Sequence, residues 1–279
     1  DANERSFQPG PRLLKMALAT LKTDPRRDLR HSILSELVEE IDETCNLTVL
    51  EDAARRVRRR VPDFQVERIP LDDKKTFDML AAGRTVGVFQ LESAGITSVC
   101  IGLRPRSIED ITAVIALYRP GPMESIPRFL ACSAHPERIT YKHPLLEPIL
   151  SVTYGCIVYQ EQVIEIFRQL AGFSLGQADM IRRAMSKKKE AVITAERAAF
   201  VHGDPARSIP GAVARGVPEQ TANAIYDEIL AFASYAFNKA HAVSYAIVSY
   251  RTAYMKRNYP HEYMAALLTA VLDNTPKVT

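Results

Sequence analysis

Apolar and polar positions alternate along most of this chain with the three- and four-residue spacing of amphipathic helices. Capping residues reinforce the pattern, because Asp and Ser precede several of the apolar runs and Gly or Pro follows them. The spacing predicts helices over residues 13–22, 35–44, 47–60, 72–83, 93–102, 107–118, 160–170, 178–203, 218–232 and 240–258.

Two short stretches depart from helical spacing. Thr85–Leu91 has the β-branched and aromatic density of a short buried strand, and Val152–Tyr159 is similar but interrupted by Gly155. We find no internal repeat. The pattern therefore predicts a mainly α fold with a few short β-strands.

The composition narrows the class of protein only a little. With 279 residues and 47% hydrophobic content, the chain is long enough for one large domain or two smaller ones. Its 36 basic and 33 acidic residues leave a net charge of +3, so only local clusters could indicate nucleic-acid binding. We expect a cytoplasmic protein with no membrane partner, because no apolar run has membrane length and no signal peptide opens the chain. The four cysteines form no CxxC pair, which argues against a zinc site.

The densest local cluster of positive charge is residues 178–189, ADMIRRAMSKKK. Arg183 and Lys187 lie four apart, where like charges on one helix face repel each other. A bound anion would offset that repulsion, and phosphate suits both a guanidinium and an ammonium group. The alternative is a solvated basic helix face, which charge alone favours. The apolar stripe that would face the core consists of Ile181, Ala184 and Met185.

Three other basic groups are weaker candidates. Lys239 and His241 lie at a predicted helix start, where cations oppose the helix dipole and an anionic ligand would relieve them. Arg119 precedes a rigid Pro-Gly-Pro turn and could contact phosphate or cap a helix end. The arginines of residues 55–60 could face a nucleic-acid backbone or only solvent.

Six motifs occur in one order and together carry a resemblance. They resemble the alpha subunits of bacterial DNA polymerase III, the C-family replicative polymerases, over about Leu47 to Val278. The motifs are LDDKKTFDML (71–80), TVGVFQLES (85–93), ALYRPGP (116–122), YGCIVYQEQV (154–163), ADMIRRAMSKKK (178–189) and FNKAHAVSYA (237–246).

The resemblance implies a division of the chain. Residues 71–279 correspond to the helical fingers domain, 46–70 to the edge of the palm or a connector, and 1–45 remain unmatched. In this family the primer 3′-hydroxyl attacks the α-phosphate of the incoming nucleotide, assisted by two magnesium ions on palm carboxylates. The family's paired catalytic aspartates lie upstream of the matched region. A third catalytic aspartate lies shortly before that region, where spacing would place Glu40, but the residues around Glu40 do not match the family's motif. We therefore assign no catalytic or metal-binding residue here, and expect Mg²⁺ to be held outside this chain in the intact enzyme.

The resemblance also assigns site residues. The incoming deoxynucleoside triphosphate would be bound by Arg182, Arg183, Lys187, Lys239, His241 and Arg119. DNA would be bound by Lys188, Lys189, Asn238, Tyr245, Gln160 and Gln162. The implied partners are primer-template DNA, deoxynucleoside triphosphates and other replisome subunits.

Two functions remain open from the sequence. One is the fingers of a bacterial replicative DNA-directed DNA polymerase, a nucleotidyltransferase that we expect to be inactive as this piece alone. The other is a non-catalytic DNA-binding module from a truncated gene product. A metabolic nucleotide-binding enzyme lacks support, because the chain has no GxxxxGK[ST] or GxGxxG loop.

Overall fold

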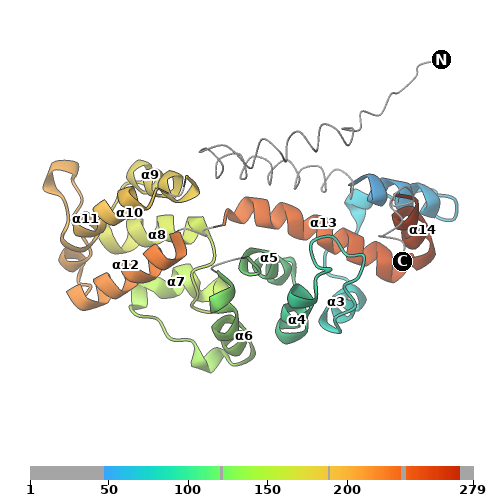
Figure 1. Ribbon diagram of the computed structural model, residues 1–279, viewed down its shortest axis with the longest axis horizontal. Helices are drawn as coiled ribbons and strands as arrows, with labels where there is room; N and C mark the ends of the chain where they lie inside the picture. Colours follow the sequence, from blue (N-terminus) through green and yellow to red (C-terminus); the bar gives the residue numbers. More distant parts are fainter. Residues whose placement is uncertain (1–46, 120–121, 188, 234–236, 271–279) are drawn as a thin grey trace, which may run out of the picture.

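The computed structural model describes residues 47–119, 122–187, 189–233 and 237–270, and within them the chain folds into helices joined by turns and loops, with no sheet (Figure 1). A first helix covers residues 47–57. The labelled helices are α3 (Lys74–Ala81), α4 (Ala94–Leu103), α5 (Ile108–Leu117), α6 (Ile126–Ala134), α7 (Glu147–Leu150), α8 (Gln160–Ala171), α9 (Leu175–Ser186), α10 (Glu190–Ala195), α11 (Arg197–His202), α12 (Glu219–Ala233), α13 (Lys239–Asn258) and α14 (Pro260–Ala270). The mainly α prediction is confirmed, and the helices predicted before residue 46 lie outside the described residues.

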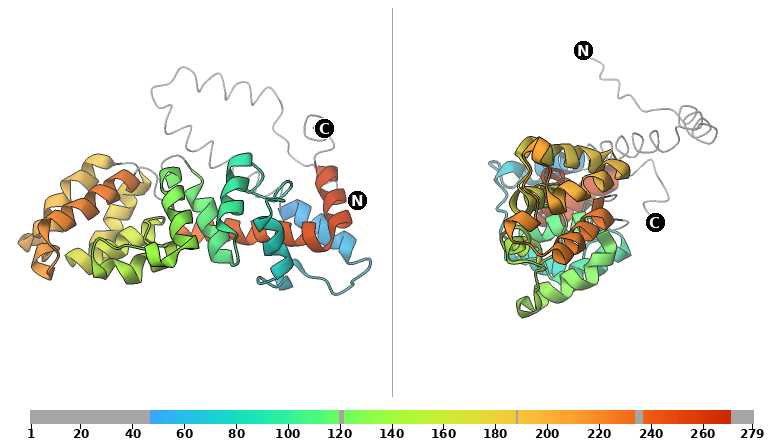
Figure 2. Two further views of the ribbon diagram at one scale, coloured as in Figure 1. Left: turned by 90° about the horizontal axis from the view of Figure 1, so that it is seen from below. Right: turned by 90° about the vertical axis from the view of Figure 1, so that its left-hand side faces the viewer.

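The molecule is elongated, and α13 runs along its middle (Figures 1 and 2). Helices α8 to α12 form one end, whereas residues 47–57, α3 and α14 lie at the other. Helix α13 packs against α5, α3 and α14. Tyr250 on α13 is fully buried. Its hydroxyl donates to the carbonyl of Pro70 at 2.9 Å and accepts from the Asp73 amide at 2.8 Å.

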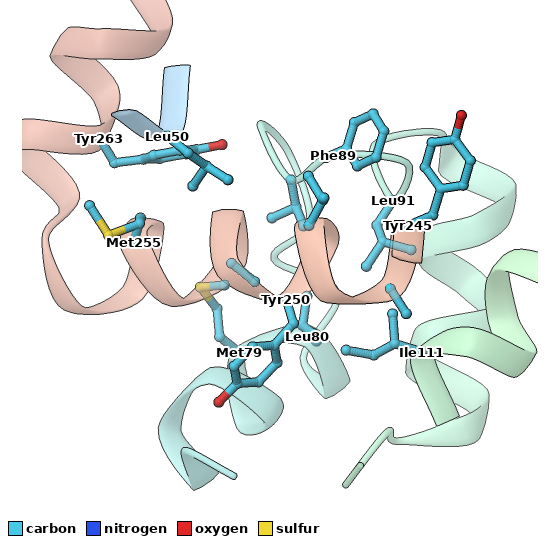
Figure 3. Close-up of a cluster of buried hydrophobic side chains, with 14 of the residues drawn as sticks. Leu50, Met79, Leu80, Phe89, Leu91, Ile111, Tyr245, Tyr250, Met255 and Tyr263 are labelled. Atoms are coloured by element: carbon cyan, nitrogen blue, oxygen red, sulfur yellow. The ribbon is translucent and has the colours of Figure 1, made fainter. Parts of the chain in front are cut away.

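Two hydrophobic cores occupy the two ends. The first surrounds α13, where side chains from residues 47–57, α3, residues 85–91, α5 and α14 meet (Figure 3). The second lies within α7 to α12 and includes a group of edge-to-face rings formed by Phe167, Phe173, Phe200 and Tyr226. A small third core lies between them and contains Leu117, Val158, Tyr159 and Ala242. That third core joins the end of α5, the start of α8 and the start of α13.

Capping chemistry sets where several helices begin. The side chains of Asp73, Ser93 and Ser107 accept hydrogen bonds from the first turns of α3, α4 and α5, as their sequence positions predicted. Ser107 and Asp110 form a complete capping box. Gly172 ends α8 with a φ of +78°, a left-handed conformation that favours glycine.

Both predicted strands are wrong. Residues 85–91 form successive turns, with hydrogen bonds from Val88 to Thr85 and from Leu91 to Val88. Residues 152–159 contain a 3-10 turn and left-handed Tyr154, and only Tyr159 forms an isolated parallel bridge, to Phe237. Their apolar character has another cause, because both segments pack against helices instead of pairing in a sheet. Val88 and Val158 are fully buried.

Candidate functional site

Three segments distant in sequence meet where α13 begins. Phe237 pairs with Tyr159, and its carbonyl accepts a hydrogen bond from the Gln160 amide at 3.0 Å. Arg119, just after α5, places its guanidinium carbon 4.0 Å from the centroid of the Phe237 ring. Such a cation–π contact is the second tie between these segments. The motifs ALYRPGP, YQEQ and FNKAH are therefore brought together.

A row of rings extends from Phe237 into the core. His241 lies 5.4 Å from Phe237 and 4.2 Å from Tyr245, and Tyr245 lies 5.4 Å from Phe89, all between ring centroids. Tyr245 is buried, whereas His241 is exposed. This row of rings therefore connects Phe237, on which Arg119 stacks, and the exposed His241 to the core around α13.

A pocket of about 510 Å³ is lined in part by Arg119, which stacks on Phe237. Arg119 and Tyr118 form one side of the pocket, and Gln90 and Glu92 line another part. Gln90 has a φ of +60°, which is uncommon for a residue other than glycine. The pocket therefore places polar side chains of the TVGVFQLES motif next to Arg119.

Lys239 is the first residue of α13 and is held in two ways. Its backbone amide donates to both carboxylate oxygens of Glu161, at 3.0 and 3.2 Å. Its ammonium lies 5.5 Å from the ring centroid of Tyr159. Asn238 caps the helix by accepting from the His241 amide at 3.0 Å, and its amide nitrogen donates to Glu161 at 3.0 Å.

These contacts change one sequence argument. We predicted that the cations at the start of α13 oppose the helix dipole and call for an anionic ligand. Glu161 already supplies an anion at that position. The dipole argument alone therefore gives no support for a bound phosphate. Neither Glu161 nor Phe237 was among the predicted site residues, although both lie within the motifs that carried the resemblance.

The basic helix confirms the predicted burial of its apolar stripe. Ile181 and Ala184 are 2% and 5% exposed, while the side chain of Met185 lies outside the described part. Arg182 and Arg183 both donate to Asp179, each through Nε at 2.7 Å. These two hydrogen bonds lower the pKa of the Asp179 carboxyl. The charges on this helix are thus partly neutralised from within it.

The lysines after these arginines extend the basic surface. Lys187 and Lys189 are exposed, and Lys188 lies outside the described residues. The backbone amide of Lys187 donates to Arg183, and that of Lys189 donates to Ala184. Both lysines therefore stay next to the end of α9.

The arginines of α9 lie at nearly the same level, measured along the helix axes, as the first residues of α8. The connection at residues 172–174 is short, which makes the packed helices α8 and α9 antiparallel neighbours. At 1.5 Å per residue, Arg183 is about 12 Å along α9 from Leu175. Gln160 is about 16 Å along α8 from Ala171. The two levels thus differ by only about 5 Å along the helix axes.

The amides predicted to bind DNA have internal contacts. Gln162 accepts from the amides of Val158 and Tyr159 and donates to Ile149 and Thr153, which uses the hydrogen-bonding capacity of its side chain. Gln160 is 5% exposed. Gln160, Gln162 and Tyr245 are therefore buried where the three segments meet, and Asn238 caps α13 beside them.

The arginines of residues 55–60 mostly face acids. Arg55 and Arg56 both pair with Asp52, Arg58 pairs with Glu51, and Arg60 pairs with Glu262 of α14. These pairs give the cluster a structural role at the end of the molecule distant from α9.

No metal site or membrane span is found within the described residues. No group of three or more His, Cys, Asp or Glu side chains in that part of the chain could hold a metal ion. The Mg²⁺ implied by the resemblance therefore has no fitting donor set among the described residues. None of the described helices is long and apolar enough to cross a bilayer.

Comparison with known proteins defines the class. Residues 46–207 match the family model of the bacterial DNA polymerase III alpha subunit finger domain. DNA polymerase III subunit alpha of Halalkalibacterium halodurans is 48% identical over 234 residues, which cover 84% of this chain and 20% of that protein. The Thermus aquaticus protein of the same name is 47% identical over 238 residues, 83% of this chain and 19% of that protein.

The chain therefore belongs to the bacterial DNA polymerase III alpha subunit family, within the DNA-directed DNA polymerases, and contains its finger domain. It spans about a fifth of the length of these relatives.

Proposed function

We propose that this chain provides the nucleotide-binding part of the fingers of a bacterial replicative DNA polymerase. The observation that carries the proposal is the meeting of Arg119, Lys239 and His241 at the start of α8, with Arg182 and Arg183 on the helix packed along it. Family membership supplies the reaction class. The intact protein would act in the cytoplasm on primer-template DNA, together with other replisome subunits.

Each cation has a role in this proposal. Arg182 and Arg183 bind the triphosphate, because guanidinium groups form paired hydrogen bonds to phosphate oxygens. Lys239, His241 and Arg119 provide further contacts to the triphosphate or the template. Lys187, Lys188 and Lys189 raise the local positive potential toward triphosphate and DNA. Several charge-assisted hydrogen bonds, at roughly 1.5–3 kcal/mol each, are the right scale to fix a triphosphate.

The catalytic centre belongs elsewhere in the intact protein. We propose that its palm carboxylates, which would hold Mg²⁺, lie outside this chain, and that residues 46–70 connect that palm to fingers formed by residues 71–279. Purified chain with magnesium and a primer-template should therefore show no nucleotide incorporation, whereas the intact gene product should extend the primer. Robust incorporation by the chain alone would contradict this division.

Titration of the purified chain with a deoxynucleoside triphosphate by calorimetry tests the binding role. Arg183→Ala should raise the dissociation constant by about tenfold or more, the equivalent of one lost charge-assisted hydrogen bond. Arg55→Ala is the matched control, because Arg55 is 72% exposed and Arg183 is 69% exposed, and each pairs with an aspartate of its own helix. Equal effects of the two substitutions would refute a specific site.

The same variants separate nucleotide binding from DNA binding. In the intact enzyme, Arg183→Ala and Lys239→Ala should raise KM for nucleotide and leave primer-template affinity nearly unchanged. A weaker DNA affinity with unchanged use of nucleotide, and a steep dependence on salt, would instead indicate a duplex-backbone surface.

A further inference from the structure

Glu161 is the acidic residue that joins α8 to the start of α13. Its carboxylate accepts three hydrogen bonds from residues 77 and 78 positions later in the chain, two from the Lys239 amide and one from the Asn238 side chain. Hydrogen bonds to an ionised acceptor are about twice as strong as neutral ones. Glu161 is therefore a strong tie between two elements that carry proposed ligand contacts.

The tie also occupies the first backbone amide of α13 before any ligand arrives. Free backbone amides at a helix start are what make such a position attractive to anions. Here the Lys239 amide is bound to Glu161 and the His241 amide to Asn238. These two amides are therefore already occupied, and the placement of the Lys239 and His241 side chains matters for any polyphosphate bound here.

We propose that Glu161 is a positioning residue for nucleotide binding, which fixes Lys239 and His241 opposite the arginines of α9. This inference rests on the nucleotide-binding function proposed above. Glu161 fixes the backbone of Lys239, while the Tyr159 ring next to it receives the ammonium. Both contacts come from the first residues of α8 and the residue before it, so α8 positions Lys239 and α9 together.

The direction in which Glu161→Gln changes the affinity for a polyphosphate distinguishes a positioning role from a simple charge effect. A carboxylate close to a bound polyphosphate repels it, so removing the charge should tighten binding if Glu161 had no other role. If Glu161 positions Lys239 and His241, Glu161→Gln should weaken binding instead. Glu161→Asp retains the charge but withdraws the carboxylate by one methylene, and should also weaken binding.

The experiment is a calorimetric titration of the 279-residue chain with a deoxynucleoside triphosphate. Glu161→Gln should raise the dissociation constant about five- to tenfold, with a similar or smaller rise for Glu161→Asp. Glu165→Gln is the matched control on the same helix, because Glu165 bonds only to Arg168 and Gln169 among the contacts described. It should leave the dissociation constant within about twofold of the wild-type value.

A double substitution shows whether Glu161 acts through Lys239. If it does, Glu161→Gln combined with Lys239→Ala should bind hardly more weakly than the weaker of the two single variants, whereas independent effects would multiply. Melting curves by circular dichroism identify a variant that fails to fold, in which case Glu161→Asp carries the comparison.

Each outcome has one meaning. Unchanged or tighter binding by Glu161→Gln, with Lys239→Ala weakened, overturns the positioning role and leaves the proposed function intact. Multiplicative effects in the double variant also overturn it. A wild-type chain that does not bind the triphosphate overturns the proposed function, and this inference with it.

Discussion

Two acidic residues lie among the proposed nucleotide-binding cations, and they differ in what they hold. Asp179 pairs with Arg182 and Arg183, three and four residues away on its own helix. Glu161 holds the start of a helix almost eighty residues later in the chain. The ion pairs of Asp179 order side chains on one helix, whereas the hydrogen bonds of Glu161 fix the position of the first residues of α13 relative to α8. Under the proposed function, Asp179 would compete with the triphosphate for the arginines, and Glu161 would position the side chains that bind it.

If Asp179 only orders side chains, α9 must be held in place by other residues. The buried face of α9, with Ala178, Ile181 and Ala184, packs in the same core as α8. Arg183 is 69% exposed, so its ion pair contributes little to that placement. The position of the arginines should therefore depend on the core and not on Asp179.

The largest expected effect tests this placement. Ile181→Ala removes a side chain that is 2% exposed and should destabilise the chain by about 2–5 kcal/mol, measured by urea denaturation. Met180→Ala is the matched control, because the neighbouring Met180 is 55% exposed. It should change stability by about 0.5 kcal/mol or less. Similar losses for the two variants would show that the core does not position α9.

Much of the fold could be predicted from local patterns. Capping residues and apolar spacing predicted α4, α5, α8 and α13 to within a residue or two, because these signals act within one helical turn. The strand predictions failed for the same reason. The segments at 85–91 and 152–159 are apolar because they pack against helices distant in sequence. Composition alone does not separate such a turn from a buried strand.

In the candidate site, too, contacts within one helix could be predicted from the sequence, whereas contacts between distant segments could not. The pairing of Asp179 with the arginines follows the three- and four-residue spacing visible in the sequence. The contact of Arg119 with Phe237 and the bonds of Glu161 to Lys239 join positions from different motifs, and no local pattern indicates them. Sequence similarity to a family placed the motifs in one protein, but only the folded chain shows which side chains meet.

The next largest effect is a change of triphosphate affinity in opposite directions when the two acidic charges are removed. Asp179→Asn should tighten triphosphate binding about two- to fivefold, because it frees two guanidinium groups from a competing carboxylate on an exposed surface. Glu161→Gln removes the same charge and should weaken binding. Asp78→Asn is the control for net charge, because it removes an acid from an exposed pair with Lys74 on distant α3. Calorimetric titration of all three would contradict the comparison if Asp179→Asn and Glu161→Gln changed affinity in the same direction.

The smallest effect is a dependence of stability on pH. Hydrogen bonds from Arg182 and Arg183 lower the pKa of Asp179 below its ordinary value of 3.8. A carboxyl whose pKa is lower in the folded state stabilises the fold above the unfolded-state pKa, and this stabilisation is lost as pH falls through the folded-state pKa. The melting temperature of the wild-type chain should therefore exceed that of Asp179→Asn slightly and constantly from pH 7 to about 5. The difference should shrink as the pH falls below about 4, where the unfolded-state carboxyl begins to bind a proton, and should vanish at a lower pH, where the folded-state carboxyl is protonated too and both chains carry a neutral residue at this position. A difference that grew as the pH fell would show that Asp179 is not held ionised by its arginines, and its role as their competing partner would be lost.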